Sequence, residues 1–214
     1  MSKLKAALFD LDGVVFDTEP QYSLFWGEQG RKYHPEIPNL EKEIKGQTLT
    51  QIFDRYFSGG LQAYQSVITA DLNRFESCMS FEYVTGFEAF VKLLRANGIK
   101  TAVVTSSNRP KMESVYSKRP EFKTLFDRIL TSEDFTGSKP DPDCYLTAAA
   151  GFGVAPDECL VFEDSFNGLK SGRAAGMKVV GLSTTNSPEA IAPLSDMVVP
   201  DYTELSIERC EDLL

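Results

Sequence analysis

The feature that most constrains the fold is an alternation of short apolar runs with stretches of helical spacing. The first run, residues 6–11, ends in acidic residues and Gly13, which indicates a buried strand followed by a tight loop. After Gly86, strand-like runs recur at residues 100–105, 128–131, 160–162, 178–182 and 197–199, with helical stretches among them. Alternation of this kind predicts an α/β fold, a Rossmann-like parallel sheet core flanked by helices.

A long stretch without strand character separates the first run from the others. It carries two stripes of apolar residues at helical spacing, which are Leu49, Ile52, Phe53 and Tyr56, and Ile68, Leu72, Phe75 and Met79. We therefore expect a small helical cap domain over residues 18–81, inserted after the first strand. The α/β core domain is then expected to comprise residues 1–17 and 82–214.

Two core helices have recognisable start signals. Thr85 and Glu88 have the spacing of a capping box for a helix that Gly98 ends. Asp141 is a candidate N-cap for another helix, with Pro142 at its first position.

Charge and composition exclude several classes of partner. The 214-residue chain has a formal net charge of -9, and a surface this acidic repels nucleic acid and anionic membranes. No stretch approaches the ~20 apolar residues of a membrane span. The four cysteines contain no CxxC pair and His34 is the only histidine, which argues against a disulfide framework, a zinc site or a histidine-based triad. We expect a cytoplasmic protein, and no obligate protein partner is evident.

Polar residues gather where the predicted strands end. In open parallel sheets, ligands bind at the carboxyl ends of the strands. The residues expected there are Asp10, Asp12, Thr105, Ser106, Glu163 and Asp164, with Lys139 in a loop that enters the same face. Each short motif alone is equally typical of a turn or a helix cap. Their occurrence in order, each at a strand end or facing loop, predicts a site.

The chemistry of this set is coherent. Clustered carboxylates repel one another unless a cation is bound, and hard oxygen ligands suit Mg²⁺, which often bridges to a substrate phosphate. A carboxylate can act as a nucleophile and form an aspartyl-phosphate. Asp12 is then placed to act as general acid for the leaving oxygen and as general base for water. These residues predict magnesium-dependent phosphoryl transfer from a small phosphorylated metabolite.

Four segments resemble the haloacid dehalogenase superfamily, most closely the subgroup of β-phosphoglucomutases and small sugar-phosphate phosphatases. They are FDLDGVVFDTE (9–19), VVTSSN (103–108), SKPDPDCY (138–145) and VFEDSFNGLKSGRAAGM (161–177). The resemblance implies that Asp10 is the nucleophile and a metal ligand, and that Asp12 is the acid/base with its backbone carbonyl on Mg²⁺. It also implies that Thr105, Ser106 and Lys139 hold the phosphoryl group, that Asp164 binds the metal, and that Glu163 binds or supports it.

Two departures from the mutase pattern bear on the reaction. Tyr22 stands where those mutases have a histidine, and Leu49, in the cap loop Lys45-Gly46-Gln47-Thr48-Leu49, stands where they have an arginine that grips a second phosphate. We therefore expect hydrolysis of a small phosphorylated metabolite, namely a sugar phosphate, rather than transfer within a sugar. Gln47, Thr48 and Asn108 are candidate substrate contacts.

Two alternatives stay open at this point. The first is a sugar-phosphate mutase of the β-phosphoglucomutase kind. The second is a phosphoacceptor signalling domain, which also uses aspartates, a threonine, a lysine and Mg²⁺, but which is shorter and has no helical insert after its first strand.

Overall fold

A six-stranded parallel sheet forms the centre of the computed structural model, which describes residues 3–45 and 47–214. The strand order is β3-β2-β1-β4-β5-β6, and the strands are β1 (Ala6–Phe9), β2 (Lys100–Val104), β3 (Arg128–Leu130), β4 (Cys159–Glu163), β5 (Lys178–Leu182) and β6 (Met197–Val199). The Rossmann-like fold predicted from the alternation is confirmed. The order reverses at β1, so its carboxyl end, next to those of β2 and β4, is where a ligand is expected.

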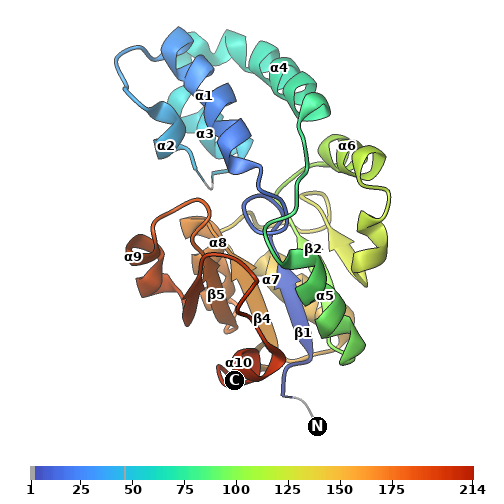
Figure 1. Ribbon diagram of the computed structural model, residues 1–214. Helices are drawn as coiled ribbons and strands as arrows, with labels where there is room; N and C mark the ends of the chain where they lie inside the picture. The colour runs from blue at the N-terminus through green and yellow to red at the C-terminus, as the bar shows by residue number, and fades with distance from the viewer. Residues whose placement is uncertain (1–2, 46) are drawn as a thin grey trace.

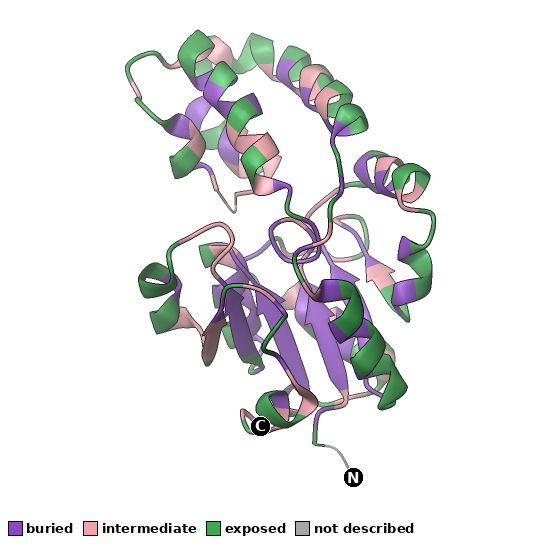
Figure 2. Ribbon diagram, viewed as in Figure 1, coloured by how far each residue is buried: buried purple, intermediate pink, exposed green. Residues whose placement is uncertain are grey.

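Helices cover both faces of this sheet (Figure 1). On one face, Ala7 and Phe9 pack in a cluster with residues of α5 (Phe87–Ala96), α6 (Arg109–Lys118) and α10 (Ile207–Glu211). On the other, Ala6 and Leu8 pack against α7 (Asp143–Phe152), α8 (Phe166–Ala174) and α9 (Pro188–Ile191). Alternate residues of one strand thus enter two cores, because successive side chains point to opposite faces. Buried residues line the strands in Figure 2.

The inserted segment forms a helical cap beyond the carboxyl ends of the strands (Figure 1). Its helices are α1 (Glu19–Tyr33), α2 (Leu40–Glu43), α3 (Leu49–Tyr56) and α4 (Gln65–Cys78), with a 3-10 turn at Gly59–Tyr64. They surround a separate apolar cluster that includes Trp26, Phe57 and Ile68. The domain boundaries stay a prediction. Of the predicted cap range, Met79 and Phe81 pack in the core's cluster, and Gly46 lies outside the described residues.

The two chain segments that join cap and core run side by side. Phe16 and Tyr83 form an antiparallel bridge, the Asp17 amide donates to the Glu82 carbonyl at 2.9 Å, and the Val84 amide donates to the Val15 carbonyl at 3.0 Å. The chain therefore enters and leaves the cap through one paired connection. No helix among the described residues is long and apolar enough to cross a bilayer.

Both predicted helix caps in the core are wrong by one residue. Helix α5 has Gly86, with φ of 81°, at its N-cap, and no side chain caps it. Thr85 instead accepts a backbone bond from Tyr202, because the left-handed glycine shifts the helix start past it. Pro142 is the N-cap of α7, and Asp141 accepts from the Asp143 amide at 2.9 Å, which makes a turn before the helix.

The Phe9 ring connects β1 to both the neighbouring strand and a covering helix. It is fully buried, stacks on Phe162 at 4.6 Å and meets Phe87 edge-on at 5.5 Å. We predict that Phe9→Ala lowers the free energy of unfolding by about 3–5 kcal/mol, the cost of a core cavity. Urea unfolding followed by circular dichroism measures this. Leu93→Ala, at a site 41% exposed, is the control and should change it by about 0.5 kcal/mol or less. A similar loss in both variants would contradict the prediction.

Candidate active site

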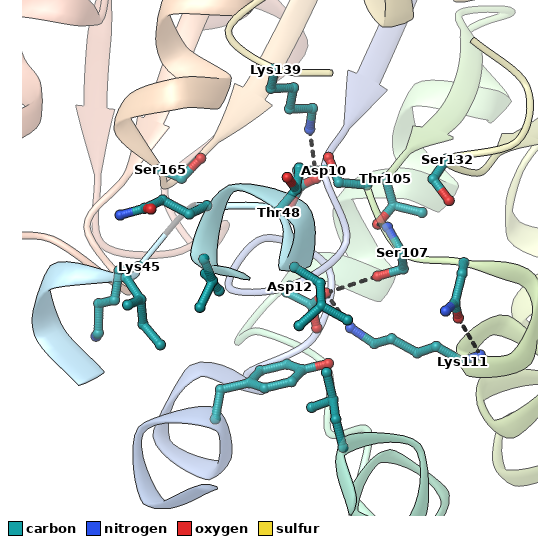
Figure 3. A pocket seen from close by; sticks show the side chains of 18 of the residues that line it. Asp10, Asp12, Lys45, Thr48, Thr105, Ser107, Lys111, Ser132, Lys139 and Ser165 are labelled. Carbon is teal, nitrogen blue, oxygen red and sulfur yellow. Dashed lines mark hydrogen bonds and ion pairs between the residues drawn. The ribbon is translucent and has the colours of Figure 1, made fainter. Parts of the chain in front are cut away.

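Sheet register brings three polar strand ends together. Phe9 pairs with Val103 of β2 and with Phe162 of β4, so the residues that follow in each strand meet at one edge. Asp10 continues β1, and its amide donates to the Phe162 carbonyl at 3.1 Å. Thr105 continues β2 and is buried, and its hydroxyl accepts from the Ser107 amide at 3.0 Å. The predicted meeting of these strand ends is what the structure shows (Figure 3).

Lys139 reaches this edge from the loop before α7. Its ammonium lies 2.6 Å from Asp10 Oδ1 and 2.6 Å from Glu163 Oε1, and it donates to the Val104 carbonyl at 3.0 Å. The side chain is 5% exposed, so these contacts are made away from water. A buried ammonium needs such partners, because an unpaired buried charge costs several kcal/mol.

Glu163 is fully buried, and hydrogen bonds engage both of its oxygens. Oε1 accepts from Lys139 and from the Tyr145 hydroxyl at 2.8 Å. Oε2 accepts from the Asp164 amide at 3.1 Å and the Ser165 hydroxyl at 3.2 Å. A Cβ on Gly168 would lie 1.8 Å from Oε1, so only glycine fits there without displacing the carboxylate. Glu163 is therefore held in place to position Lys139.

A candidate metal site lies beside Lys139. Asp10, Glu163 and Asp164 each offer an oxygen, and these atoms lie within 4.8 Å of one another. The Thr185 hydroxyl donates to Asp164 Oδ2, which fixes that carboxylate. Gly13 has φ of 72°, and a Cβ there would lie 2.0 Å from Asp164 Oδ2. Close-set hard oxygen donors with too little positive charge around them suit a divalent cation such as Mg²⁺.

Asp12 points away from this group and toward the cap. It accepts from the Thr18 hydroxyl at 2.6 Å and the Ser107 hydroxyl at 3.3 Å, and it is ion-paired with Lys111 (Figure 3). Asp12 was predicted as a metal ligand, and its side chain is not part of the oxygen group described above. Its backbone carbonyl is the group through which the resemblance assigns metal contact.

Sequence reasoning missed several residues that position these side chains. They are Thr18 and Lys111 around Asp12, Tyr145 behind Glu163, and Thr185 beside Asp164. Thr18 and Tyr145 lie within segments that carried the family resemblance, so those motifs held a usable signal. For Lys111 the sequence holds only a weak signal. It lies in the first turn of α6, where its amide donates to Asn108 Oδ1 at 3.0 Å.

A cavity of about 440 Å³ lies between the cap and the strand ends. The predicted phosphate-binding residues Thr105, Ser106 and Lys139 line it, as do the candidate substrate contacts Gln47, Thr48 and Asn108. Two of the latter also have local roles. Thr48 caps α3 in a capping box with Gln51, and Asn108 caps α6. Their contact with a substrate stays a prediction.

Burial and like charges alter the acidity of the carboxylates. Burial raises the pKa of Asp10 from 3.8 to about 7, Lys139 opposes the rise, and Glu163 and Asp12 add to it. Burial also raises the pKa of Asp164 well above its usual value, with Glu163 the next cause. One ammonium does not balance these carboxylates, so a bound divalent cation would lower both pKa values.

Comparison with known proteins defines the class of this enzyme. The model of the haloacid dehalogenase-like hydrolase family matches residues 4–176, and the chain belongs to that family. Hexitol phosphatase A of Escherichia coli is 29% identical over 97% of this chain and 95% of its own. The structure is similar to a HAD hydrolase, family IA, variant 3, from Entamoeba histolytica, with a TM-score of 0.83 and 22% identity over 98% of this chain and 99% of that one. A β-phosphoglucomutase from Clostridium difficile gives 0.79, with 21% identity over 98% and 96%.

We predict that the raised Asp10 pKa makes stability depend on pH when no divalent cation is present. The native state binds the Asp10 proton more tightly than the unfolded state, so the free energy of unfolding falls as pH rises from about 4 to about 7. One pKa unit corresponds to about 1.36 kcal/mol. Urea unfolding in EDTA across this range, compared with Asp10→Asn, measures the effect. The variant lacks this titration and should lose less stability, whereas identical pH dependence would contradict the assignment.

Proposed function

We propose that the protein is a magnesium-dependent phosphatase that hydrolyses a small phosphorylated metabolite, in particular a sugar phosphate, through an aspartyl-phosphate on Asp10. The observation that carries this proposal is the buried contact of Lys139 with Asp10, with Asp164 beside them. A carboxylate nucleophile, an ammonium for the phosphoryl oxygens and a place for a divalent cation thus lie together. Membership of a hydrolase family and likeness to a hexitol phosphatase support the same reading.

In the first step, an Asp10 carboxylate oxygen attacks phosphorus and the bond to the leaving oxygen breaks. Lys139, the Thr105 hydroxyl and Ser106 hold the transferring phosphoryl group in this proposal. Asp10 and Asp164 would hold Mg²⁺, with the Asp12 carbonyl as a further ligand. Bound there, Mg²⁺ supplies positive charge that offsets repulsion between the carboxylate and the phosphate.

Asp12 moves the protons in both steps. It gives a proton to the leaving oxygen as the aspartyl-phosphate forms, and it then takes a proton from the water that attacks phosphorus. The second step releases inorganic phosphate and restores the Asp10 carboxylate. The contacts of the Asp12 carboxylate with the Thr18 and Ser107 hydroxyls and the Lys111 ammonium fix its position, which supports its role in proton transfer.

Hydrolysis is favoured over a mutase reaction by the two departures in the cap. The Tyr22 hydroxyl donates a hydrogen bond to Glu76 at 2.7 Å. Leu49 lines the cavity with an apolar side chain at the position where a mutase would bind a second phosphate. A mutase has to retain a bisphosphate and exclude water, and neither device is present at these positions. Family membership and the helical cap likewise disfavour a phosphoacceptor signalling domain.

We predict that Asp10→Asn reduces turnover to background while the protein stays folded, because an amide is a poor nucleophile. Release of inorganic phosphate from p-nitrophenyl phosphate and from sugar phosphates, with Mg²⁺ or with excess EDTA, measures it. The wild type should lose activity in EDTA and regain it when Mg²⁺ is added. Turnover in the variant at the wild-type rate would refute the nucleophile, and turnover unaffected by EDTA would refute the metal.

We also predict that Asp12→Asn separates the two proton transfers. For a sugar phosphate, whose leaving oxygen needs a proton, kcat/KM should fall by about 10²–10⁴-fold. For p-nitrophenyl phosphate the first step should persist, because its leaving group departs without a proton. The phosphoenzyme should then accumulate, and acid quench with intact-protein mass spectrometry measures it. Equal losses on both substrates without accumulation would contradict the acid/base role.

A further inference from the structure

The wall that the cap contributes to the cavity is acidic. Glu19, Glu41 and Glu76 line it from the cap, together with Tyr22, Trp26 and Asn73. They come from α1, α2 and α4, so separate elements contribute one carboxylate each. With the phosphate held by Lys139 and Thr105, as proposed above, the rest of a substrate extends toward the part of the cavity that the cap lines.

The cations that line the cavity are already paired with carboxylates. Within the described residues, the cations that line the cavity are Lys45, Lys111 and Lys139. Lys45 lies 3.8 Å from Glu19 and donates to the Thr185 carbonyl at 3.4 Å, and Lys111 is ion-paired with Asp12. Lys139 is held by Asp10 and Glu163. Each of the three ammonium groups therefore already has a carboxylate partner.

Glu41 and Glu76 have no ion pair within the described part of the chain. Glu76 is 8% exposed, and the Tyr22 hydroxyl donates to its Oε1 at 2.7 Å, which fixes the carboxylate. The Tyr22 ring in turn lies under the Lys111 ammonium at 4.8 Å. Asn73 lies one turn before Glu76 on α4 and lines the same cavity, so α4 contributes an amide and a carboxylate to this wall.

We infer that Glu76, assisted by Glu41, selects the leaving group by charge, so that the substrate is a singly phosphorylated, hydroxyl-rich compound without a further anionic group. Fixed carboxylates accept hydrogen bonds from hydroxyls, and they repel a second phosphate or a carboxylate. This inference rests on the proposed phosphatase function. It adds the class of leaving group and names a specificity-determining residue in the cap.

The test compares kcat/KM for sorbitol 6-phosphate, fructose 1,6-bisphosphate and 2-phosphoglycolate with Mg²⁺. Assays at about pH 8 keep the carboxylates ionised, since burial raises the pKa of Glu76 above its usual value. The wild type should favour sorbitol 6-phosphate by about tenfold or more. Fructose 1,6-bisphosphate and 2-phosphoglycolate each carry a second anionic group. For each of them, kcat/KM relative to that for sorbitol 6-phosphate should rise by about tenfold in Glu76→Gln. It should rise further in the double variant Glu76→Gln with Glu41→Gln. Added salt should reduce the wild-type preference, which a purely steric wall would not show.

Asp71→Asn is the matched control, because Asp71 lies on α4 outside the cavity and pairs with Arg74 at 3.6 Å. It should leave the substrate ratios unchanged. Should Glu76→Gln fail to fold, Glu41→Gln alone, at a half-buried site, gives the same readout. Equal wild-type rates on all three substrates, or unchanged ratios in the variants, would overturn the inference. Hydrolysis of p-nitrophenyl phosphate by the wild type separates the two proposals, since its absence counts against the phosphatase itself.

Discussion

The site depends on one buried ammonium held between two carboxylates. The Lys139 ammonium lies 2.6 Å from both Asp10 and Glu163, and it reaches both because β1 and β4 are neighbours in register. Glu163 is fixed in turn by Tyr145 and by the loop that starts α8. A charge taken out of water is tolerated only with such partners. The packing of the sheet and the positions of the reacting groups are therefore consequences of the same arrangement.

The same arrangement leaves the carboxylates of the site with too little positive charge around them, which is the reason to expect a bound cation. One lysine faces Asp10, Glu163 and Asp164, and burial raises the pKa of both aspartates. A divalent cation would restore the balance and would also ionise the proposed nucleophile. In the proposed function, the phosphate of a substrate then enters a region that is no longer repulsive, and the carboxylates of the cap wall are proposed to repel a second anion. Within one cavity, charge can both admit the substrate and restrict its identity.

Much of the fold and the core of the site could be predicted from sequence. The apolar runs end in Asp10, Thr105 and Glu163, and parallel strands necessarily bring such ends to one edge. The directions of individual side chains could not be predicted. Asp12 turns toward Lys111 and Thr18, and Tyr145 of α7 supports Glu163 of β4, because packing between distant segments decides these contacts. The Thr85 cap was wrong because Gly86 adopts a left-handed conformation that propensity does not reveal.

The bridge between Phe16 and Tyr83 means that the chain leaves for the cap and returns from it at adjacent positions. Asp17 and Glu82, which flank the insert, are hydrogen-bonded neighbours, so the chain returns to the sheet at the point where it left it. Helices of the insert can be lengthened, exchanged or resurfaced while β1, β2 and β4 keep their places. The cavity wall that the insert supplies can therefore change in sequence while Asp10, Thr105 and Lys139 stay at the strand ends.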